Sequence, residues 1–514
     1  MSVQIYRGAE SQPFVPASRA QWVAAGGAML LFVGLSIGLS LTRSPWWDEG
    51  LFADIALNFR NFGHLGSSVL APYGFMEWPG VHQYTYWQCP LYLIALGSWF
   101  RLAPVTVVWM RLFSVMWGCI FVVSWFVLVK ALSRNESLAL LVASVIALGY
   151  ESVVKASYGR MDMMCAALGV AGLASYFWYR DSHWARGVIL ASWFGAASLF
   201  CHPVGAVMNV AIAAMVLWDW RKIRLSILVV ASLPYLIGIS FCLLYIQRAP
   251  DIFLAQSRAA WGYRVSGFSA TLRNVLNDAN QRYIRYYYGA YTGFFKLKSA
   301  ALVFLAIGVV GLLADRNLRA QPVAKRLLVL AFIAYVGLAI VDNEKYVNYL
   351  IFTVPFLTAC AAVWVHGRWH GGSLGRSLAS VLLGAYVLVT ICAVGYRIHA
   401  NSYRNSYKPV VALVQSSLPP GGLVMGGSEL GFALGFGPPL IDDRYLGFFS
   451  GETPEVFVVN GYYGPHWART PRLKLAWEFS RRKLRSQYYL IFDNKEYSIY
   501  VRNDVPPPPH SANY

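Results

Sequence analysis

The chain has 514 residues, of which 57% are hydrophobic and only 13% are charged, and its formal net charge is +19. A soluble protein carries about 25% charged residues, so this composition excludes an ordinary soluble enzyme and predicts a protein that crosses a membrane several times. The excess of cations does not indicate a nucleic-acid partner, because the chain has no long basic run and no nucleic-acid-binding motif. The cations lie between apolar segments, where they direct topology and contact anionic lipid.

Apolar windows long enough to cross about 30 Å of hydrocarbon recur along residues 1–396 and predict about eleven membrane spans. They fall near residues 22–42, 108–129, 137–150, 163–179, 187–201, 204–219, 225–245, 299–314, 327–341, 347–366 and 377–396. With a cytoplasmic N-terminus, alternate loops lie inside, and each contains Lys or Arg, as the positive-inside rule requires. We therefore expect a polytopic α-helical membrane protein whose first span is retained as an anchor.

One apolar stretch, Pro90 to Leu102, is left out of these spans because it is short, contains Arg101 and precedes Pro104. Counting it as a span would place every later basic loop outside. We expect it to form an interfacial or re-entrant helix. It belongs to an outer segment of residues 43–107, which also contains the amphipathic stretch Leu51 to Phe62.

An odd number of spans delivers residues 397–504 to the outer face, where the sequence is no longer membrane-like. Helical spacing covers Lys408 to Leu418, and a hairpin turn is predicted at residues 492–497. Strand-like segments are Leu423 to Met425, Val456 to Val459, Tyr488 to Phe492 and Ser498 to Arg502. We expect a small soluble α/β or α+β domain there, followed by a disordered, proline-rich tail at residues 505–514.

The tetrapeptide Trp46-Trp47-Asp48-Glu49 directly follows the first span and places two adjacent carboxylates at the edge of the membrane. Ionised side chains are costly there, which favours a functional site, although a solvated loop with an aromatic belt fits the same residues. The predicted topology puts three more polar clusters on the same outer face. They are Glu151, Lys155, Arg160 and Asp162; Cys201-His202-Pro203; and Asp342-Asn343-Glu344-Lys345-Tyr346.

The long outer loop at residues 246–298 holds eight cations against only Asp251 and Asp278. This excess on the side that the positive-inside rule disfavours predicts an anionic partner, for which a lipid-linked phosphate is the natural candidate. Five tyrosines lie between residues 283 and 291. Their rings can pack on sugar faces or lie in the headgroup belt, and the belt is the prediction for most of them.

Several motifs appear in the order typical of one superfamily. After the Asp48-Glu49 pair come Tyr86-Trp87-Gln88-Cys89-Pro90-Leu91, Arg111-Leu112-Phe113-Ser114, Arg160-Met161-Asp162 and Lys345-Tyr346 with Pro355. Over residues 20 to 365 the chain thereby resembles the GT-C glycosyltransferases of the protein O-mannosyltransferase and aminoarabinose transferase superfamily. It departs from that pattern at Gln88-Cys89-Pro90, where a cation before two prolines is usual, and at His202-Pro203, where a Lys-Gly-Pro turn is usual.

The resemblance implies transfer of a sugar from a polyprenyl phosphate carrier to an acceptor hydroxyl or amine, with inversion at the anomeric carbon. The two departures leave the sugar and the acceptor open: glycolipid, polysaccharide and protein all fit. The predicted topology, together with the absence of long insertions typical of eukaryotic members, favours a bacterial plasma (inner) membrane with the active site facing the periplasm. A monomer is expected, because no further amphipathic or coiled-coil segment requires a partner.

The chemistry requires a base for the acceptor and positive charge for the leaving phosphate. Asp48 is the predicted base by family position. Glu49 either orients it or binds the acceptor, and Asp162 either positions the acceptor or orients Arg160; a local ion pair is the alternative for Asp162. The candidate phosphate-binding residues are Lys345, Arg258, Arg160 and Tyr346, with an interfacial anchor as the alternative for Lys345. The candidate substrate contacts are His202, Trp47 and Tyr86, with a structural turn as the alternative for His202.

No metal is required, because a monophosphate carrier can leave by charge pairing alone, yet Asp48, Glu49 and Asp162 also suit a divalent ion. The seven cysteines form no CxxC pair, so we expect neither disulfides nor a cysteine metal site. Two other classes of protein remain open: a transporter or flippase of lipid-linked sugars, and a non-catalytic scaffold. A transporter or flippase would have charged residues deep within its spans and two halves of the chain with repeated structure. A non-catalytic scaffold leaves the Asp48-Glu49 pair unexplained.

Overall fold

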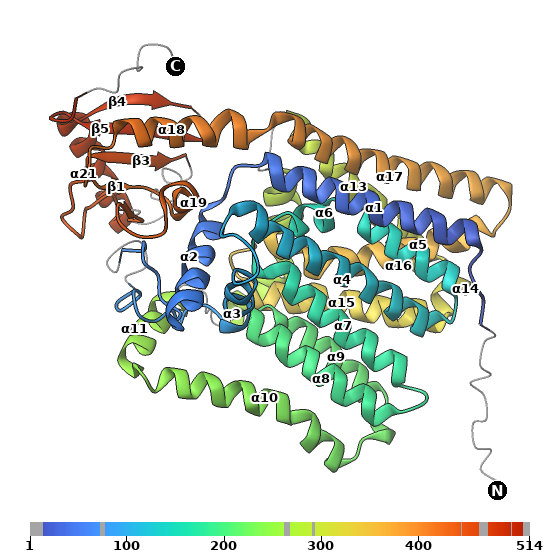
Figure 1. Cartoon of the computed structure of the whole chain (residues 1–514). Coiled ribbons are helices and arrows are strands. Elements are labelled where there is room, and N and C mark those ends of the chain that lie inside the picture. Colours follow the sequence, from blue (N-terminus) through green and yellow to red (C-terminus); the bar gives the residue numbers. More distant parts are fainter. Residues whose placement is uncertain are drawn as a thin grey trace, which may run out of the picture.

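The computed structural model describes residues 14–71, 78–261, 268–289, 293–443, 445–461, 471–494 and 496–506. A bundle of long, roughly aligned helices carries a small sheet domain at one end, and the short helix α2 (Trp47–Phe62) lies between the two (Figure 1). The largest hydrophobic core runs through the bundle, and two smaller cores lie in the sheet domain.

The bundle is built from helices that are apolar around most of their circumference, as expected where lipid replaces water. Its long members are α1 (Arg19–Thr42), α4 (Val107–Ser133), α7 (Met161–Tyr179), α8 (Trp184–Cys201), α10 (Leu225–Ile246), α13 (Ala300–Ala314), α15 (Pro322–Val341), α16 (Val354–Trp369) and α17 (Ser373–Ala400). The shorter members are α5 (Glu136–Ala147), α9 (Gly205–Trp218) and α14 (Arg316–Ala320), with η1 (Trp220–Lys222) between α9 and α10.

Within the described residues, 8 helices are long and apolar enough to cross a membrane, or 9 if α5 and α6 (Tyr150–Ala156), which meet at 62°, count as one bent span. This compares with about eleven spans predicted from the sequence. Relative to the count of 9, the difference lies in two predicted spans: residues 204–219 form α9, of 14 residues, and residues 347–366 are divided between η4 (Val347–Phe352) and α16, of 16 residues.

Helix α7 lies at the centre of the bundle, and α10 lies at its edge. In the most apolar window of α7, 83% of the residues are buried, because α7 packs against both α4 and α8. In the most apolar window of α10 only 11% of the residues are buried, and the buried residues of this helix are Ala231 and Pro234. Figure 1 shows α10 standing apart from the other long helices.

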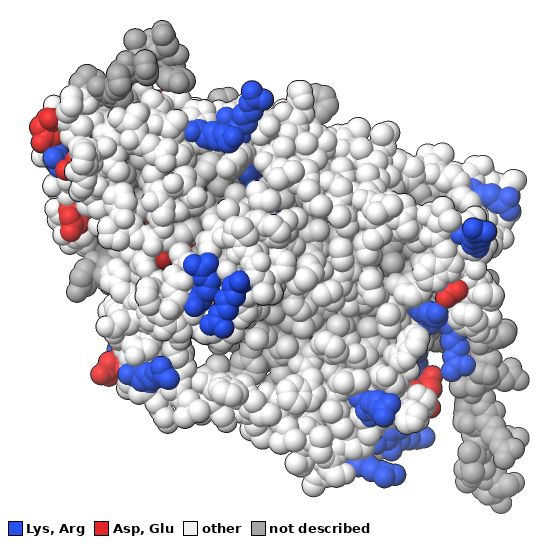
Figure 2. Space-filling view, viewed as in Figure 1, with Lys and Arg blue, Asp and Glu red and all other residues white. Residues whose placement is uncertain are grey.

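Figure 2 shows exposed Lys and Arg side chains gathered at the end of the bundle opposite the sheet domain, with a band of uncharged surface across the middle of the same face. An uncharged belt bordered by charge is what a hydrocarbon slab requires. At the basic end, Arg134 pairs with Asp181 and Arg180 with Asp219, at 3.4 and 2.6 Å.

Short helices cover the end of the bundle that faces the sheet domain. They are α2, α3 (Pro90–Trp99), α6, α11 (Pro250–Trp261), α12 (Phe268–Asp278), η2 (Ala279–Tyr288), η3 (Gly293–Ser299) and η4. The short helix predicted within Pro90 to Leu102 is therefore confirmed as α3. Helix α2 begins four residues earlier than the predicted amphipathic stretch, because the Glu49 carboxylate accepts a hydrogen bond from the Trp46 backbone N–H and caps the helix itself, at 2.9 Å.

The sheet domain contains five strands in the order β2-β1-β3-β5-β4. The strands are β1 (Val424–Met425), β2 (Leu440–Ile441), β3 (Val456–Asn460), β4 (Tyr488–Asp493) and β5 (Tyr497–Arg502), and β4 and β5 form an antiparallel hairpin. The accompanying helices are η5 (Tyr403–Tyr407), α18 (Lys408–Ser417), η6 (Ser428–Leu430), α19 (Gly431–Leu434) and α21 (Pro471–Gln487). The predicted helix, four strands and hairpin are confirmed here. Residues 507–514 of the predicted disordered tail lie outside the described residues.

Candidate functional site

Glu49 is the best-fixed carboxylate at the junction between the bundle and α2. Its side chain is fully buried and lies in the first turn of α2, where a helix N-terminus favours negative charge. Arg111 of α4 donates two hydrogen bonds to the carboxylate, from Nε and Nη2, at 2.8 and 2.7 Å. The Gly159 N–H donates a third at 2.8 Å, and Arg43 lies 3.5 Å away.

These partners decide the protonation of Glu49. Burial alone would raise its pKa, but the charge and hydrogen bonds of Arg111, assisted by Arg43 and the Gly159 N–H, lower the pKa to about 2. Arg111 also donates to the backbone carbonyls of Ser40 and Arg43, so the same guanidinium connects the end of α1 to α2. Glu49 is thus a permanently ionised structural carboxylate with little basicity.

Asp48 has a different environment from its neighbour. Its side chain is 19% exposed and forms an ion pair with Arg160, which immediately precedes α7. Arg160 also contacts the buried Asp162, with 2.8 Å between Nε and Oδ2. The structure therefore brings Asp48, Glu49, Arg160 and Asp162 together from α2 and the start of α7. The second oxygen of Asp162, Oδ1, is buried and has no hydrogen-bond partner among the described residues.

Aromatic rings border this acidic cluster. The Arg160 guanidinium lies over the Trp46 ring, 5.2 Å from its centroid, and Trp46 meets Tyr158 edge to face at 6.0 Å. His202, which follows α8, accepts a hydrogen bond at Nδ1 from the Val204 N–H. In neutral His202 this leaves Nε2 protonated and facing the Tyr349 hydroxyl at 3.4 Å. His202 is therefore held as a turn residue beside α7, and its electrostatic partners include Asp162.

Lys345 is engaged in a buried ion-pair network. Its Nζ lies 2.9 Å from Asp278 and donates to the Ala339 carbonyl, and its side chain is 2% exposed. Arg282 joins the same network by contacting both Asp278 and Asp342. Two cations thus balance two carboxylates.

The other two candidate phosphate ligands are exposed. Tyr346 is 41% exposed, and its backbone N–H and carbonyl are bound by Asp342 and Arg282. Arg258 lies on the exposed face of α11. Arg258 has no described contact with the acidic cluster. Tyr346 acts electrostatically on Arg160, the fourth candidate, which forms part of the cluster.

Trp47 and Tyr86 occupy two different interfaces. The Trp47 indole N–H donates to Asp442 of the sheet domain, whose backbone also pairs with Val69 and Ala71. Tyr86 lies near the outer end of α10, where its hydroxyl donates to the Tyr245 carbonyl at 3.0 Å and its ring stacks on Tyr84. Trp47 is therefore next to the acidic pair, and Tyr86 is not in contact with it among the described residues.

A groove of about 690 Å³ runs between α3, α8 and α10. Its walls are apolar, with Ile94 on α3, Phe200 on α8 and Phe241 on α10, and its lining includes two basic residues, Arg248 and His64. Helix α3 separates the groove from the acidic cluster. Leu91 lines the groove, and the adjacent Tyr92 is buried within electrostatic range of Glu49 and Asp162.

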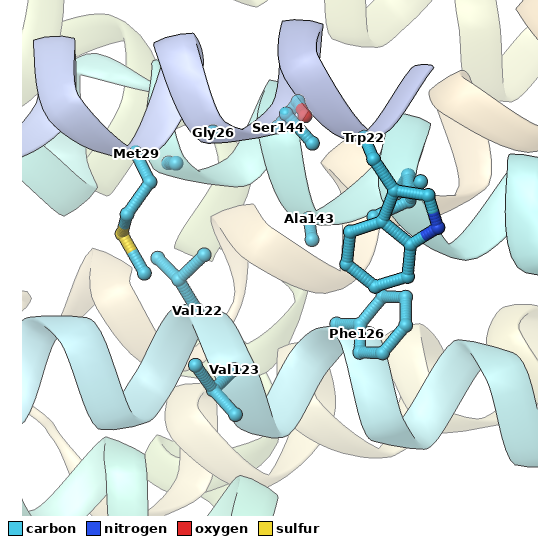
Figure 3. Close-up of a pocket in the computed structure, with 11 residues that line it drawn as sticks. Trp22, Gly26, Met29, Val122, Val123, Phe126, Ala143 and Ser144 are labelled. Carbon is cyan, nitrogen blue, oxygen red and sulfur yellow. The ribbon is translucent and has the colours of Figure 1, made fainter. Parts of the chain in front are cut away.

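A second pocket, of about 220 Å³, lies near the beginning of α1 (Figure 3). Trp22, Gly26 and Met29 of α1 face Val122 and Phe126 of α4 across it. Trp22 lies in the first turn of α1, and the other end of this helix leads to the acidic pair, so the pocket is remote from the candidate site. Its described lining is apolar apart from Ser144 on α5, as expected for a surface that faces lipid.

Among the described residues, no group of three or more His, Cys, Asp or Glu side chains is arranged to hold a metal ion. In the acidic cluster the Arg160 guanidinium lies between Asp48 and Asp162, where a bound cation would otherwise balance their charges.

Three important residues were not among the candidates selected from the sequence. Arg111 was noted only within a motif, although a cation that opens an apolar span is a usable signal. Arg43 gave no signal beyond its position at the end of the first span. Asp442 lies 395 residues from its partner Trp47, and no local pattern identifies it.

No protein-family model and no curated protein matches this sequence. Solved structures do. ArnT from Cupriavidus metallidurans bound to undecaprenyl phosphate is similar with a TM-score of 0.59 and 13% identity, over 94% of this chain and 98% of that chain. The apo form of the same protein gives a TM-score of 0.56 and 12% identity, over 93% and 98% of the two chains.

The oligosaccharyltransferase of Archaeoglobus fulgidus in the apo form is also similar, with a TM-score of 0.52 and 12% identity, over 96% of this chain and 76% of that chain. The chain has the GT-C fold. The fold expected from the order of the motifs is thereby confirmed. At these identities the likeness is one of fold.

Proposed function

We propose that this protein is a membrane glycosyltransferase that moves a sugar from a polyprenyl phosphate carrier to an acceptor on the outer face, with inversion at the anomeric carbon. One observation carries the proposal: a partly exposed Asp48, adjacent to a rigidly fixed Glu49, lies where the GT-C bundle meets the sheet domain. The fold supports the enzyme class, and one neighbour of this fold is solved with undecaprenyl phosphate. The outer face is the periplasmic side of a bacterial plasma membrane in this proposal.

The two adjacent carboxylates have separate roles. Asp48 is the general base that accepts the acceptor's proton, because it is the partly exposed member of the pair and its ion pair with Arg160 fixes its direction. Glu49 orients it by anchoring the first turn of α2 to Arg111. Asp162 orients Arg160, and the unpartnered Oδ1 of Asp162 is available to a substrate hydroxyl.

The groove between α3, α8 and α10 suits the tail of the carrier, because it is apolar, large and only one helix away from Asp48. Arg248, which lines it, is the cation we assign to the leaving phosphate, and Arg258 on the following helix is a second candidate. Lys345 would have to leave its pair with Asp278 to take part. A phosphate that departs by charge pairing requires no metal in this scheme.

The proposal is tested by measuring sugar release from a panel of polyprenyl phosphate donors by the purified full chain in lipid, with Asp48→Asn as the variant. We expect turnover to fall about 10²- to 10⁴-fold while carrier binding persists, because the variant lacks only the base. Asp251→Asn is the matched control, because Asp251 is an exposed carboxylate on α11. Unchanged turnover in Asp48→Asn would contradict the assignment of the base.

A transporter or flippase of lipid-linked sugars is the alternative, because the groove would serve it equally well. It differs in its product: a flippase moves an intact lipid-linked sugar between leaflets and breaks no glycosidic bond. The same donor panel separates the two, since movement without release would exclude the transferase.

A further inference from the structure

Two histidines lie at the end of α16, remote from the candidate site. His366 is in the last turn of this helix, and His370 is its C-cap residue. Arg368, between them in sequence, pairs at 3.0 Å with Asp315, the residue that caps α14. This contact places the two histidines near α14, at the end of the bundle opposite the sheet domain (Figure 1). In the predicted topology that end faces the cytoplasm.

The spacing of the two histidines brings their rings together. Residues four apart on a helix are neighbours on one face, and two histidines at this spacing are a known zinc-binding arrangement. The His366 and His370 ring centroids are 4.8 Å apart, and the ring planes are inclined at 62°. Two imidazoles on one tetrahedral ion have ring centroids about 5 Å apart, given Zn–N bonds of about 2.0–2.1 Å. The rings therefore already have the separation that a shared metal ion requires.

One ring nitrogen of the pair is buried without a hydrogen bond. His366 Nε2 has no hydrogen-bond partner in the described part of the chain. A buried polar atom without a partner is costly, and coordination of a metal ion by an imidazole nitrogen would remove that cost. His370 is exposed, so an ion would reach the pair from solvent.

Arg368, the cation nearest to the pair in sequence, is directed away from it. It is two residues from each histidine, which places it about 200° around the helix from both. Its guanidinium lies 5.6 Å from the centroid of the Trp364 ring, and its charge is paired with Asp315. The last carbonyls of a helix also carry partial negative charge, which stabilises a bound cation.

The number of protein ligands determines the kind of site. A structural zinc ion has four protein ligands and a catalytic zinc ion has three, whereas this pair supplies two. In the part of the chain that the structure describes, no third His, Cys, Asp or Glu joins them. Water must complete the coordination, so we expect reversible binding of an ion that suits imidazole, such as zinc, copper or nickel.

We propose that His366 and His370 bind a divalent transition-metal ion of the class of Zn²⁺. The bound ion would link the last turn of α16 to the residue at which the chain turns toward α17. It would thereby stabilise the end of the bundle opposite the sheet domain. The pair is remote from Asp48, so this inference does not depend on the proposed function.

The first arm titrates Zn²⁺ into the full chain, without an affinity tag, in phosphatidylcholine nanodiscs. We expect saturable binding by the wild type and a higher unfolding temperature, because the ion binds the folded chain. His370→Gln should weaken binding about tenfold or more, since it removes one of the two protein ligands. His370 is exposed, so this variant should fold like the wild type.

His183→Gln is the matched control for this arm. His183 is an exposed histidine at the same end of the bundle, between α7 and α8. The control should bind Zn²⁺ as tightly as the wild type. Absence of binding by the wild type, or equal weakening in His183→Gln and His370→Gln, would overturn the proposal.

A second arm uses Cu²⁺ to identify the ligands directly. The electron paramagnetic resonance spectrum of Cu²⁺ bound to the wild type should show coupling to two imidazole nitrogens. His366→Gln and His370→Gln should each remove one of these nitrogens, a readout that a change in stability alone does not produce. A spectrum that neither substitution alters would place the ion elsewhere and contradict the assignment.

Discussion

At the scale of single residues, two adjacent acids in one helical turn have opposite environments. Glu49 is fully buried with a pKa lowered to about 2, whereas Asp48 retains solvent access beside Arg160. The difference arises because successive residues of a helix point about 100° apart, so one side chain faces the Arg111 guanidinium and the other faces the open side of the site. Two acids that are adjacent in sequence can therefore differ in burial, ion pairing and basicity.

Replacement of Glu49 by Gln should be strongly destabilising, because it leaves the Arg111 charge buried without its partner. Loss of one member of a buried pair costs about 3–5 kcal/mol, which thermal unfolding of the full chain in lipid would measure. Glu478→Gln, at an exposed position of α21, is the control that should unfold like the wild type.

The pH dependence of the same variant adds a second check. Because the pKa of Glu49 is lowered on folding, its stabilisation is complete above the unfolded value of 4.5 and is lost as the pH falls toward 2. The wild type should therefore lose stability over that window, and Glu49→Gln should lose less. An equal slope in both proteins would show that Glu49 is not the responsible group.

At the scale of elements, the sheet domain holds the helix that carries the acids. Segment η6 packs directly on α2, and a Cβ at Gly50 would lie 2.2 Å from the backbone of Ser428. The Ser428 N–H also donates to Asp442, which in turn accepts from Trp47. Residues 47 to 50 of the candidate site therefore contact the sheet domain at both ends.

Replacement of Gly50 by Ala should disturb this contact without altering any charge. The methyl group collides with backbone rather than with a flexible side chain, so α2 and η6 must separate, and we expect a loss of about 1–3 kcal/mol in stability together with lower sugar release. Gly34→Ala is the matched control, because nothing lies within 4 Å of a Cβ at that helical position. Equal activity of the two variants would show that the contact does not position α2.

The sequence predicts elements well where the signal is local. Apolar runs predicted the long helices, strand-like composition predicted β3 and β4, and alternation predicted β5, because each pattern extends over several turns or residues. Strand β2 was not predicted: its two residues directly follow Pro438-Pro439, a pair that is typical of a turn or loop.

The contacts that build the site were not predictable in the same way. Arg111 meets Glu49 across 62 residues, and Lys345 meets Asp278 rather than a ligand. Such pairings depend on the tertiary packing of several elements. The order of motifs predicted the GT-C fold and brought Asp48, Glu49, Arg160 and Asp162 to attention, but it did not assign their roles.

At the scale of the whole molecule, the bundle separates two chemically different ends. The basic loops lie at one end, and the sheet domain with the acidic cluster lies at the other (Figures 1 and 2). An intervening apolar belt is consistent with both ends being outside the hydrocarbon.

Cysteine labelling tests this orientation. In a cysteine-free background, Lys222→Cys should react only with reagent on the cytoplasmic side, and Ser486→Cys only with reagent on the outer side. Both positions are exposed, so access is limited by the membrane alone. Labelling of both from one side would contradict the predicted topology.

The isolation of α10 has a consequence for how reactants arrive. Since only Ala231 and Pro234 of this helix are buried, the groove beside it borders lipid instead of a wall of protein. A long-chain carrier would then reach the groove by diffusing sideways within one leaflet, without crossing water. The relevant concentration would be the number of carrier molecules per unit area of membrane, and dilution with other lipids would slow the enzyme even when the total amount of carrier is unchanged.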